Sequence, residues 1–283
     1  MPAVNEVVGR CRGNAIRAYW WTGERNFGDL ITPALLRSYG LTPVCCRDPA
    51  AASLAATGSI IGMLPRDFEG IVLGSGLLSD NPNLRLPNAR ILALRGEMTK
   101  DRLEVRDEIA LGDPGLLVAD LLPRRTPSKS FVLGIVLHYE DRDNAIIRTM
   151  VRRYPREVTV INVQKGPIPV VRDIDRCQFV LSSSLHGVVA ADALGIPNCW
   201  TVLSHRVFGK GFKFRDYYSA FGLDRKPIRV SADTPLSRIV GLMAPPPAAL
   251  PVRQEALRSL FASVAREFHG KRRESHGEAR HCD

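Results

Sequence analysis

Short apolar runs rich in β-branched residues alternate along the chain with stretches of helix length. This alternation is typical of βαβ units, in which helices cover both faces of a parallel sheet. It therefore predicts an α/β protein. In the first half, the predicted strands are residues 15–21, 53–57, 70–73 and 90–94, and the predicted helices are residues 29–39 and 97–105.

A segment rich in Pro, Arg and Ser, residues 122–130, interrupts the alternation. Its composition is typical of a linker, and the pattern restarts after it. The predicted strands of the second half are residues 131–138, 158–163, 178–182 and 198–203, and the predicted helices are residues 145–153, a polar helix ending at 176, and residues 185–194.

The two alternating halves predict two Rossmann-like domains, residues 1–125 and 130–245, that face each other across a cleft. A Pro-rich run then precedes a last helix, residues 251–270, in which apolar residues recur on one face with a period of about 3.6 residues. We expect this helix to brace the domains. The polar residues 271–283 are expected to form a flexible tail.

The apolar content of 45% is that of a globular protein with a hydrophobic core. No segment reaches the roughly 18 uncharged apolar residues of a membrane span, and residues 1–12 lack the apolar region of a signal peptide. The six cysteines lack the C-x-x-C spacing of metal or redox sites, so we expect reduced thiols. These features predict a cytoplasmic location.

The 39 Lys and Arg residues exceed the 29 Asp and Glu residues, giving a formal net charge of +10. Residues 206–229 hold seven of the basic residues and only two acidic ones, and this local surplus favours an anion-binding site. Within it, residues 210–218 mix cations with aromatic side chains, which stack on sugars as well as on bases. Because no nucleic-acid-binding motif accompanies them, we expect a sugar or phosphate ligand and no nucleic acid.

Ligands of open parallel sheets bind beyond the carboxyl ends of the strands, so the residues after each predicted strand are the candidates for a site. Asn26-Phe27-Gly28-Asp29 follows the first strand, and Asp29 is placed to cap the first helix. Thr57-Gly58-Ser59 and Leu73-Gly74-Ser75-Gly76 each let the backbone approach a ligand, although tight turns also explain their glycines. Neither is a dinucleotide fingerprint or a P-loop.

Arg95 directly follows a predicted strand and precedes Gly96. Its guanidinium is a fork of donors that suits a phosphate or a carboxylate. The alternative is an ion pair at the surface.

Residues 178–197 contain a strand that runs into three serines and then into a helix of small residues. This places His186 in the first helical turn, where the dipole favours a neutral imidazole and where N–H groups and serine hydroxyls face a bound anion. A titratable group at such an edge is an acid–base candidate, although a lone histidine is often structural. His138, at the end of a predicted strand, is a parallel case. No two histidines have metal-ligand spacing, and we expect neither a metal nor a cofactor.

Taken in order, these motifs resemble the polysaccharide pyruvyl transferase family, and in particular its exopolysaccharide ketal-pyruvate transferases. The resemblance implies a fold like that of the GT-B glycosyltransferases. It also implies that phosphoenolpyruvate donates pyruvate, as a ketal, to a sugar of a lipid-linked repeat unit. The motifs that carry it are Asn26-Phe27-Gly28-Asp29, Gly74-Ser75-Gly76-Leu77, Leu94-Arg95-Gly96, Gly112-Asp113-Pro114, His138-Tyr139, Ser183-Ser184-Leu185-His186-Gly187, Gly195-Ile196-Pro197 and Phe212-Lys213-Phe214-Arg215-Asp216-Tyr217-Tyr218.

The catalytic residues that the resemblance implies are Arg95, His186 and Lys213. His186 would protonate the donor as a general acid, and the two cations would hold it and stabilise the departing phosphate. The acceptor would be a lipid-linked oligosaccharide, with peripheral contact at the inner face of the plasma membrane. The residues expected to bind substrate are Asn26, Gly28, Asp29, Gly58, Ser59, Gly74, Ser75, Asp113, His138, Ser183, Ser184 and Tyr217.

Two other functions fit part of the pattern. In a nucleotide-sugar glycosyltransferase of the same architecture, the helix start at Ser184 would hold a diphosphate. A non-catalytic polysaccharide-binding or assembly protein would bind glycan without forming a product, but it would leave Arg95, His186 and Lys213 without a chemical role.

Overall fold

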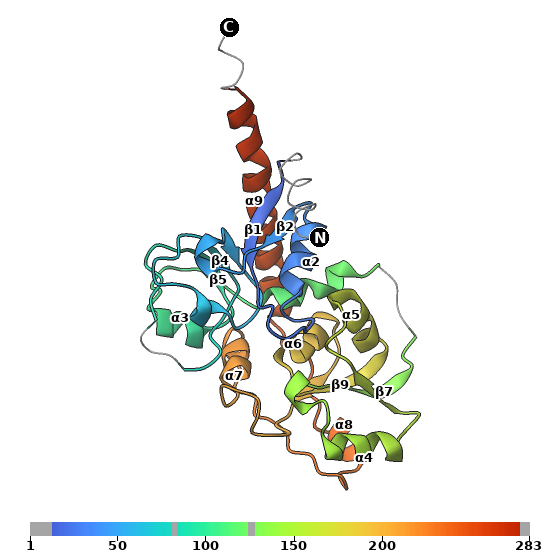
Figure 1. Ribbon diagram of the computed structural model, residues 1–283. Coiled ribbons are helices and arrows are strands. Elements are labelled where there is room, and N and C mark those ends of the chain that lie inside the picture. Colours follow the sequence, from blue (N-terminus) through green and yellow to red (C-terminus); the bar gives the residue numbers. More distant parts are fainter. Residues whose placement is uncertain (1–12, 81–83, 124–127, 278–283) are drawn as a thin grey trace.

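The computed structural model describes residues 13–80, 84–123 and 128–277, and it contains two parallel sheets (Figure 1). The first has six strands in the order β2-β1-β3-β4-β5-β6, and the second has four in the order β10-β9-β7-β8. The α/β prediction is confirmed. The strands are β1 (Ala15–Tyr19), β2 (Thr42–Cys45), β3 (Leu54–Ala55), β4 (Ile71–Leu73), β5 (Arg90–Leu94), β6 (Ala110–Leu111), β7 (Phe131–Val136), β8 (Val158–Ile161), β9 (Cys177–Ser182) and β10 (Asn198–Trp200).

Helices cover these sheets and connect them (Figure 1). The predicted helix 145–153 is observed with those bounds, whereas the others differ from prediction by a few residues at one or both ends. The α-helices are α2 (Ile31–Ser38), α3 (Glu97–Leu103), α4 (Ala145–Arg153), α5 (Pro167–Asp175), α6 (Leu185–Ala193), α7 (Phe212–Ser219), α8 (Leu236–Val240) and α9 (Leu250–Gly277), and the 3₁₀ turns are η1 (Pro49–Ala51), η2 (Ile61–Met63), η3 (Pro114–Leu121) and η4 (Tyr139–Asp141).

Helix α2 begins later than the sequence predicts. Its N-cap residue is Leu30, and no side chain caps it, so the predicted capping role of Asp29 is wrong. The carboxylate of Asp29 instead accepts a hydrogen bond from the Asn26 amide. This leaves Asp29 free to face the space beyond the end of β1.

Several elements lack a sequence signal. β2 carries Pro43 on an edge strand, and β3 and β6 have only two residues each. Helix α7 has buried residues around most of its circumference, so its sequence shows no simple polar and apolar faces. Tertiary packing determines the position of such a helix, so the periodicity of the sequence does not predict it.

The segment η3 lies at the junction of the two sheets. It packs against α2, α5, α6 and α9, and Leu116, Leu117 and Val118 are fully buried. One hydrophobic cluster extends through it from Ile16 of β1 to Val136 of β7. The two sheets therefore share a continuous core.

Helix α9 packs on the first half of the chain. Leu257 and Phe261 are buried, and the Phe261 ring stacks on Tyr39 at 5.4 Å between centroids. The helix continues through Gly270 to Gly277, past its predicted end at residue 270. A single glycine costs a helix only about 1 kcal/mol, and the Lys, Arg and Glu residues that follow favour continuation. Residues 278–283 of the predicted tail lie outside the described residues.

The predicted linker, residues 122–130, separates the two sheets along the chain, and its residues 124–127 lie outside the described part. Within the described ranges, no helix is long and apolar enough to span a membrane.

Candidate active site

A cavity of about 190 Å³ is lined by residues that follow strands of both sheets. Its lining residues come after β1, β3, β4, β7, β8 and β9, which is where parallel sheets bind ligands. Helix α7 contributes one further residue, Lys213. Of the residues predicted for the site, those that line the cavity are Asn26, Asp29, Ser59, His138, Ser184, His186 and Lys213.

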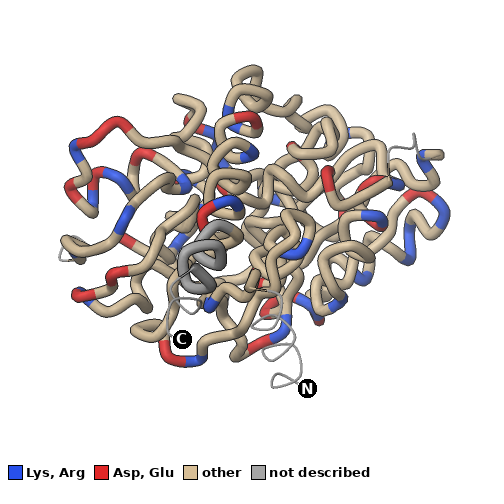
Figure 2. The backbone as a smooth tube through the Cα atoms, turned by 90° about the horizontal axis from the view of Figure 1, so that it is seen from above, with Lys and Arg blue, Asp and Glu red and all other residues tan. Residues whose placement is uncertain are grey.

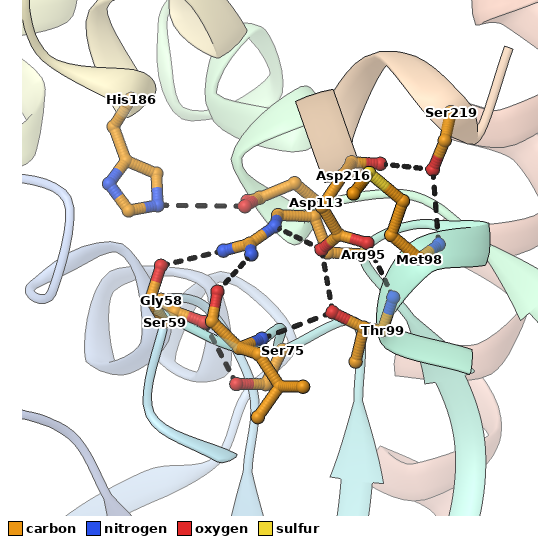
Figure 3. A network of polar contacts seen from close by, with 11 residues as sticks. Gly58, Ser59, Ser75, Arg95, Met98, Thr99, Asp113, His186, Asp216 and Ser219 are labelled. Atoms are coloured by element: carbon orange, nitrogen blue, oxygen red, sulfur yellow. Dashed lines mark hydrogen bonds and ion pairs between the residues drawn. The ribbon is translucent and has the colours of Figure 1, made fainter. Parts of the chain in front are cut away.

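His186 lies in the first turn of α6, as predicted, and its side chain is largely buried. The ring meets the edge of Phe27, and a Cβ atom added to Gly28 would lie 2.0 Å from Nδ1. Gly28 is therefore required for the close approach of the backbone to the imidazole. On the other side of the ring, Nε2 lies 3.6 Å from the Asp113 carboxylate (Figure 3).

His138 is a second imidazole at the cavity. Burial and the neighbouring cation of Lys213 lower the pKa of His138 from 6.5 to about 3, so its ring is neutral at physiological pH. Its Nδ1 accepts a hydrogen bond from the Glu140 backbone N–H at 3.3 Å, which assigns the ring proton to Nε2. His138 is thus suited to donate a hydrogen bond rather than to act as an acid.

Lys213 is the cation of the cavity. Burial and the nearby Arg95 lower its pKa from 10.5 to about 8, while the carboxylates of Asp29 and Asp141 act in the opposite direction. Among the described residues, its Nζ donates no hydrogen bond to a protein acceptor. An ammonium group without a protein acceptor beside a cavity is suited to an anionic ligand.

Asp29 faces these basic groups. Its pKa is raised, principally by burial, while His186, the hydrogen bond from Asn26 and Lys213 oppose the rise. Asn26 also accepts a hydrogen bond from the Asp29 backbone N–H at 3.2 Å, which fixes the turn. The cavity therefore combines a carboxylate with an imidazole and an ammonium group.

Arg95 does not line the cavity. Its guanidinium is fully buried and donates to Asp216 and to Ser59 (Figure 3), and also to the Leu77 carbonyl. The Nε to Asp216 Oδ2 distance is 2.8 Å. The sequence led us to expect that Arg95 projects toward a ligand or forms an ion pair at the surface. It instead forms a buried ion pair with Asp216, and Ser59 links its guanidinium to the cavity.

Thr99 completes this polar cluster. Asp216 accepts hydrogen bonds from the Thr99 backbone N–H and hydroxyl, each at 2.7 Å. A Cβ atom on Gly96 would lie 1.7 Å from the Asp216 carbonyl oxygen, and one on Gly76 would lie 2.3 Å from Arg95 Cζ. The Arg95-Gly96 and Ser75-Gly76 motifs therefore serve the docking of α7 on α3.

The remaining predicted substrate-binding residues lie behind the cavity. Ser75 donates to the Gly58 carbonyl at 2.8 Å, and Ser183 accepts from the His138 backbone N–H at 3.0 Å. The Tyr217 hydroxyl donates to Asp192 at 2.7 Å. Gly58 and Gly74 have positive φ angles of 115° and 83°, which explains these glycines by backbone conformation. These residues support the site instead of lining it.

Of the seven basic residues between positions 206 and 229, Lys213 is the one that lines the cavity. Basic and acidic positions are interspersed over the molecule (Figure 2). The charge surplus in the sequence therefore overstated the number of cations at the site. In the part of the chain that the structure describes, no group of three or more His, Cys, Asp or Glu residues could hold a metal ion.

Sequence reasoning missed the apolar part of the lining. Trp21 follows β1 and is 40% exposed, and Tyr139 follows the predicted site residue His138. Trp21 is the last residue of the predicted strand 15–21, and Tyr139 directly follows the predicted strand 131–138, so position at a strand end would have indicated both. The other residues of this wall are Ile60, Met63, Leu78, Val163 and Leu185.

Comparison with known proteins finds similarity over the part of the chain that carries this site. A family model described as polysaccharide pyruvyl transferase matches residues 71–205. The succinoglycan biosynthesis protein ExoV of Rhizobium meliloti is 25% identical over 228 residues, which cover 76% of this chain and 68% of that protein. An uncharacterized protein of Acanthamoeba polyphaga mimivirus is 29% identical over 163 residues, which cover 55% of this chain and 56% of that protein.

Among solved structures, an uncharacterized protein of Klebsiella pneumoniae aligns at 12% identity with a TM-score of 0.42, covering 81% of this chain and 98% of that chain. The segment matched by the family model carries Arg95, Asp113, His138 and His186, and Lys213 lies just beyond it. Through the family model over residues 71–205 and the similarity to ExoV, the chain is similar to polysaccharide pyruvyl transferases.

Proposed function

We propose that the enzyme transfers pyruvate from phosphoenolpyruvate to two hydroxyls of a sugar in a lipid-linked polysaccharide repeat unit. The observation that carries the proposal is the convergence of His186, Lys213 and the amino end of α6 on one cavity. The name of the relative ExoV, which refers to succinoglycan biosynthesis, supports a polysaccharide acceptor.

The donor has a carboxylate and a phosphate, so its site needs more than one anion-binding group. Lys213 supplies a positive charge, and His138 supplies a neutral N–H donor. The first backbone N–H groups of α6 are unpaired within the helix and lie at the positive end of its dipole, next to Ser184. Together they favour a small dianion or trianion at this end of the cavity.

The chemistry begins with protonation of the donor's methylene carbon. His186 delivers that proton, and a sugar hydroxyl attacks the resulting oxocarbenium-like carbon. Loss of phosphate then allows the second hydroxyl to close the ketal ring. One hydroxyl proton ends on the new methyl group and the other on the released phosphate, so the reaction needs no redox partner.

Two further residues have distinct roles in this proposal. Asp29 accepts a proton from an attacking hydroxyl, because its carboxylate lies in the same cavity as His186. Arg95 positions Ser59 and adds positive potential at Lys213 from behind the wall. It therefore acts without touching the donor.

For the architecture, we propose a GT-B-like arrangement, in which two Rossmann-like domains hold donor and acceptor between them. The two parallel sheets and the cavity lined from both support it. The hydrogen bond from the Phe27 N–H to the Val163 carbonyl, at 2.7 Å, ties the two lobes together beside the cavity.

We also propose that the enzyme works in the cytoplasm and touches the inner face of the membrane, where a lipid-linked acceptor resides. The loop before α7 supports this contact: Phe208 is 67% exposed, and Arg206 and Lys210 beside it are exposed cations. This loop passes close to Leu78 of the cavity wall, since a Cβ atom on Gly209 would lie 2.2 Å from the Leu78 carbonyl oxygen. Salt-sensitive cosedimentation with anionic vesicles that weakens in Phe208→Ser would test it.

The reaction is tested by incubating the enzyme with an isolated lipid-linked glycan and phosphoenolpyruvate, and separately with nucleotide sugars. A pyruvyl ketal mass shift with release of inorganic phosphate is expected only in the first reaction. Release of nucleotide would favour a glycosyltransferase. Glycan binding without any product would favour a non-catalytic role.

A further inference from the structure

Two buried polar atoms next to the cavity face each other and have no other partner. Nε2 of His186 and Oδ2 of Asp113 are both buried, and neither makes a hydrogen bond within the described part of the protein. They lie 3.6 Å apart (Figure 3). Buried polar groups nearly always have a hydrogen-bond partner, so each of these two atoms is the natural partner of the other.

The Asp113 carboxylate is fixed from behind. Asp113 is the N-cap residue of η3, and its Oδ1 accepts a hydrogen bond from the Gly115 backbone N–H at 2.8 Å. The preceding Gly112 has a φ angle of 147°, a conformation that favours glycine. The carboxylate is fully buried and does not line the cavity, so its free oxygen is directed to His186 rather than to a substrate.

The two imidazole nitrogens therefore have different surroundings. Nε2 faces Asp113, whereas Nδ1 lies against Gly28 on the opposite side of the ring. A carboxylate accepts an N–H, so Asp113 selects the neutral tautomer that carries its proton on Nε2. Nδ1 then carries a lone pair in the neutral ring and the exchangeable proton in the charged ring.

We infer that Asp113 is a positioning residue that fixes the tautomer and orientation of His186, so that Nδ1 is the atom that exchanges protons with substrate. Hydrogen bonds of acid–base groups are often long in the free enzyme and shorten when substrate binds, so a separation of 3.6 Å fits such a pair. This part of the inference rests on the proposed function.

The proton path follows from this assignment. In the charged ring, the Nδ1–H bond breaks as a C–H bond forms at the donor's methylene carbon. The ring that remains is neutral, with its proton on Nε2 beside Asp113. The ring recovers its charge when Nδ1 takes the proton of one acceptor hydroxyl, while the proton that Asp29 takes from the other hydroxyl passes to the released phosphate. Asp113 keeps its own charge throughout, as a carboxylate that stabilises an adjacent imidazolium.

The tautomer is tested by nitrogen NMR of the full chain labelled at histidine, at a pH at which the imidazole is neutral. The His186 signals are assigned by their loss in His186→Ala. We expect a protonated Nε2 and an unprotonated Nδ1 in the wild type, and a mixture of tautomers in Asp113→Asn. Because this measurement needs no substrate, it does not depend on whether pyruvyl transfer is the reaction. A wild-type His186 with its proton on Nδ1 would overturn the inference, whether or not any variant folds.

Kinetics supply the second readout. In Asp113→Asn we expect kcat to fall at least about tenfold while KM for phosphoenolpyruvate stays near the wild-type value, because the residue acts through His186. An increase in KM with unchanged kcat would instead mean that Asp113 contacts the donor, and would refute the positioning role.

The matched control is Asp192→Asn. Asp192 is also a buried aspartate and lies on the same helix as His186, but it accepts hydrogen bonds from Asn198 and Tyr217 and does not line the cavity. We expect its variant to leave the His186 tautomer unchanged. An equal tautomer change in both variants would show a general loosening of α6 and would overturn the specific role of Asp113.

Discussion

The polar cluster around Arg95 and the cavity around His186 meet at Ser59, yet they differ in how their polar groups are satisfied. In the cluster, the guanidinium, the Asp216 carboxylate and Thr99 bond to one another. At the cavity, His186 Nε2 and the ammonium group of Lys213 have no hydrogen-bond partner among the described residues.

The contrast separates two uses of similar residues. A buried charge whose donors are all directed to protein acceptors fixes the relative positions of the elements that it joins. A buried charge without such acceptors is poised for a ligand that will supply them. The sequence alone, which shows one Arg and one Lys in neighbouring motifs, does not distinguish the two.

The largest effect should come from disrupting the polar cluster around Arg95, which should lower the stability of the protein. We expect Arg95→Met to lower the free energy of unfolding by about 3–5 kcal/mol, because it leaves the buried Asp216 carboxylate without its cation. Urea unfolding measures the change. Lys213→Met is the matched control and should cost far less, since Nζ donates no hydrogen bond to the described residues. Equal destabilisation in the two variants would abolish the distinction.

At the cavity around His186, we expect a loss of turnover rate rather than of stability. His186→Ala should lower turnover at least about 10²-fold, or roughly 2.7 kcal/mol in the activation free energy, because it removes the proposed general acid. The variant should still fold, which its circular dichroism spectrum would show. Initial rates of phosphate release measure the effect, and near-normal turnover would disprove the acid assignment.

A smaller effect is expected from crowding the same imidazole. In Gly28→Ala the new methyl group would lie 2.0 Å from His186 Nδ1, so the ring must move, at a cost of about 1–3 kcal/mol. We expect a lower kcat. Gly62→Ala controls for the substitution itself, because a Cβ atom at that exposed position meets no atom within 4 Å. Equal kinetics in the two variants would argue against a role for the imidazole position.

The smallest expected effect is a dependence on pH. The pKa of Lys213 is lowered to about 8, so the side chain is charged below that pH and loses its charge as the pH rises through it. KM for phosphoenolpyruvate should therefore rise above about pH 8. Lys213→Arg, which stays charged, should show a flat profile even if its activity is lower. A rise of the same size in both enzymes would assign the titration to another group.

The sequence predicted the features that depend on local pattern. The alternation located the main strands and the helices after them, and the position of His186 at the start of α6 followed from the strand before it. The same reasoning failed for Arg95, because its partner Asp216 lies 121 residues away in the chain. Nothing near Arg95 in the sequence reveals that its donors are occupied.

Position after a strand also located part of the cavity lining. Residues directly after strands reach the cavity, as His138 and Ser184 do, whereas the neighbouring Ser183 faces the opposite way and supports the backbone. Local spacing fixes which residues reach the correct edge of a sheet. It does not fix which side chains point into the cavity, because this depends on turns whose geometry is set by tertiary contacts.

Helix α7 carries both Lys213 and Asp216, so the contact that attaches this helix to the first half of the chain also delivers the lysine to the cavity. During synthesis, Arg95 leaves the ribosome long before its partner does. This contact can form only after both residues have been synthesised. With Lys213 in its proposed role, turnover would begin only after the second half of the chain has folded against the first, and a nascent chain that lacks α7 would be inactive.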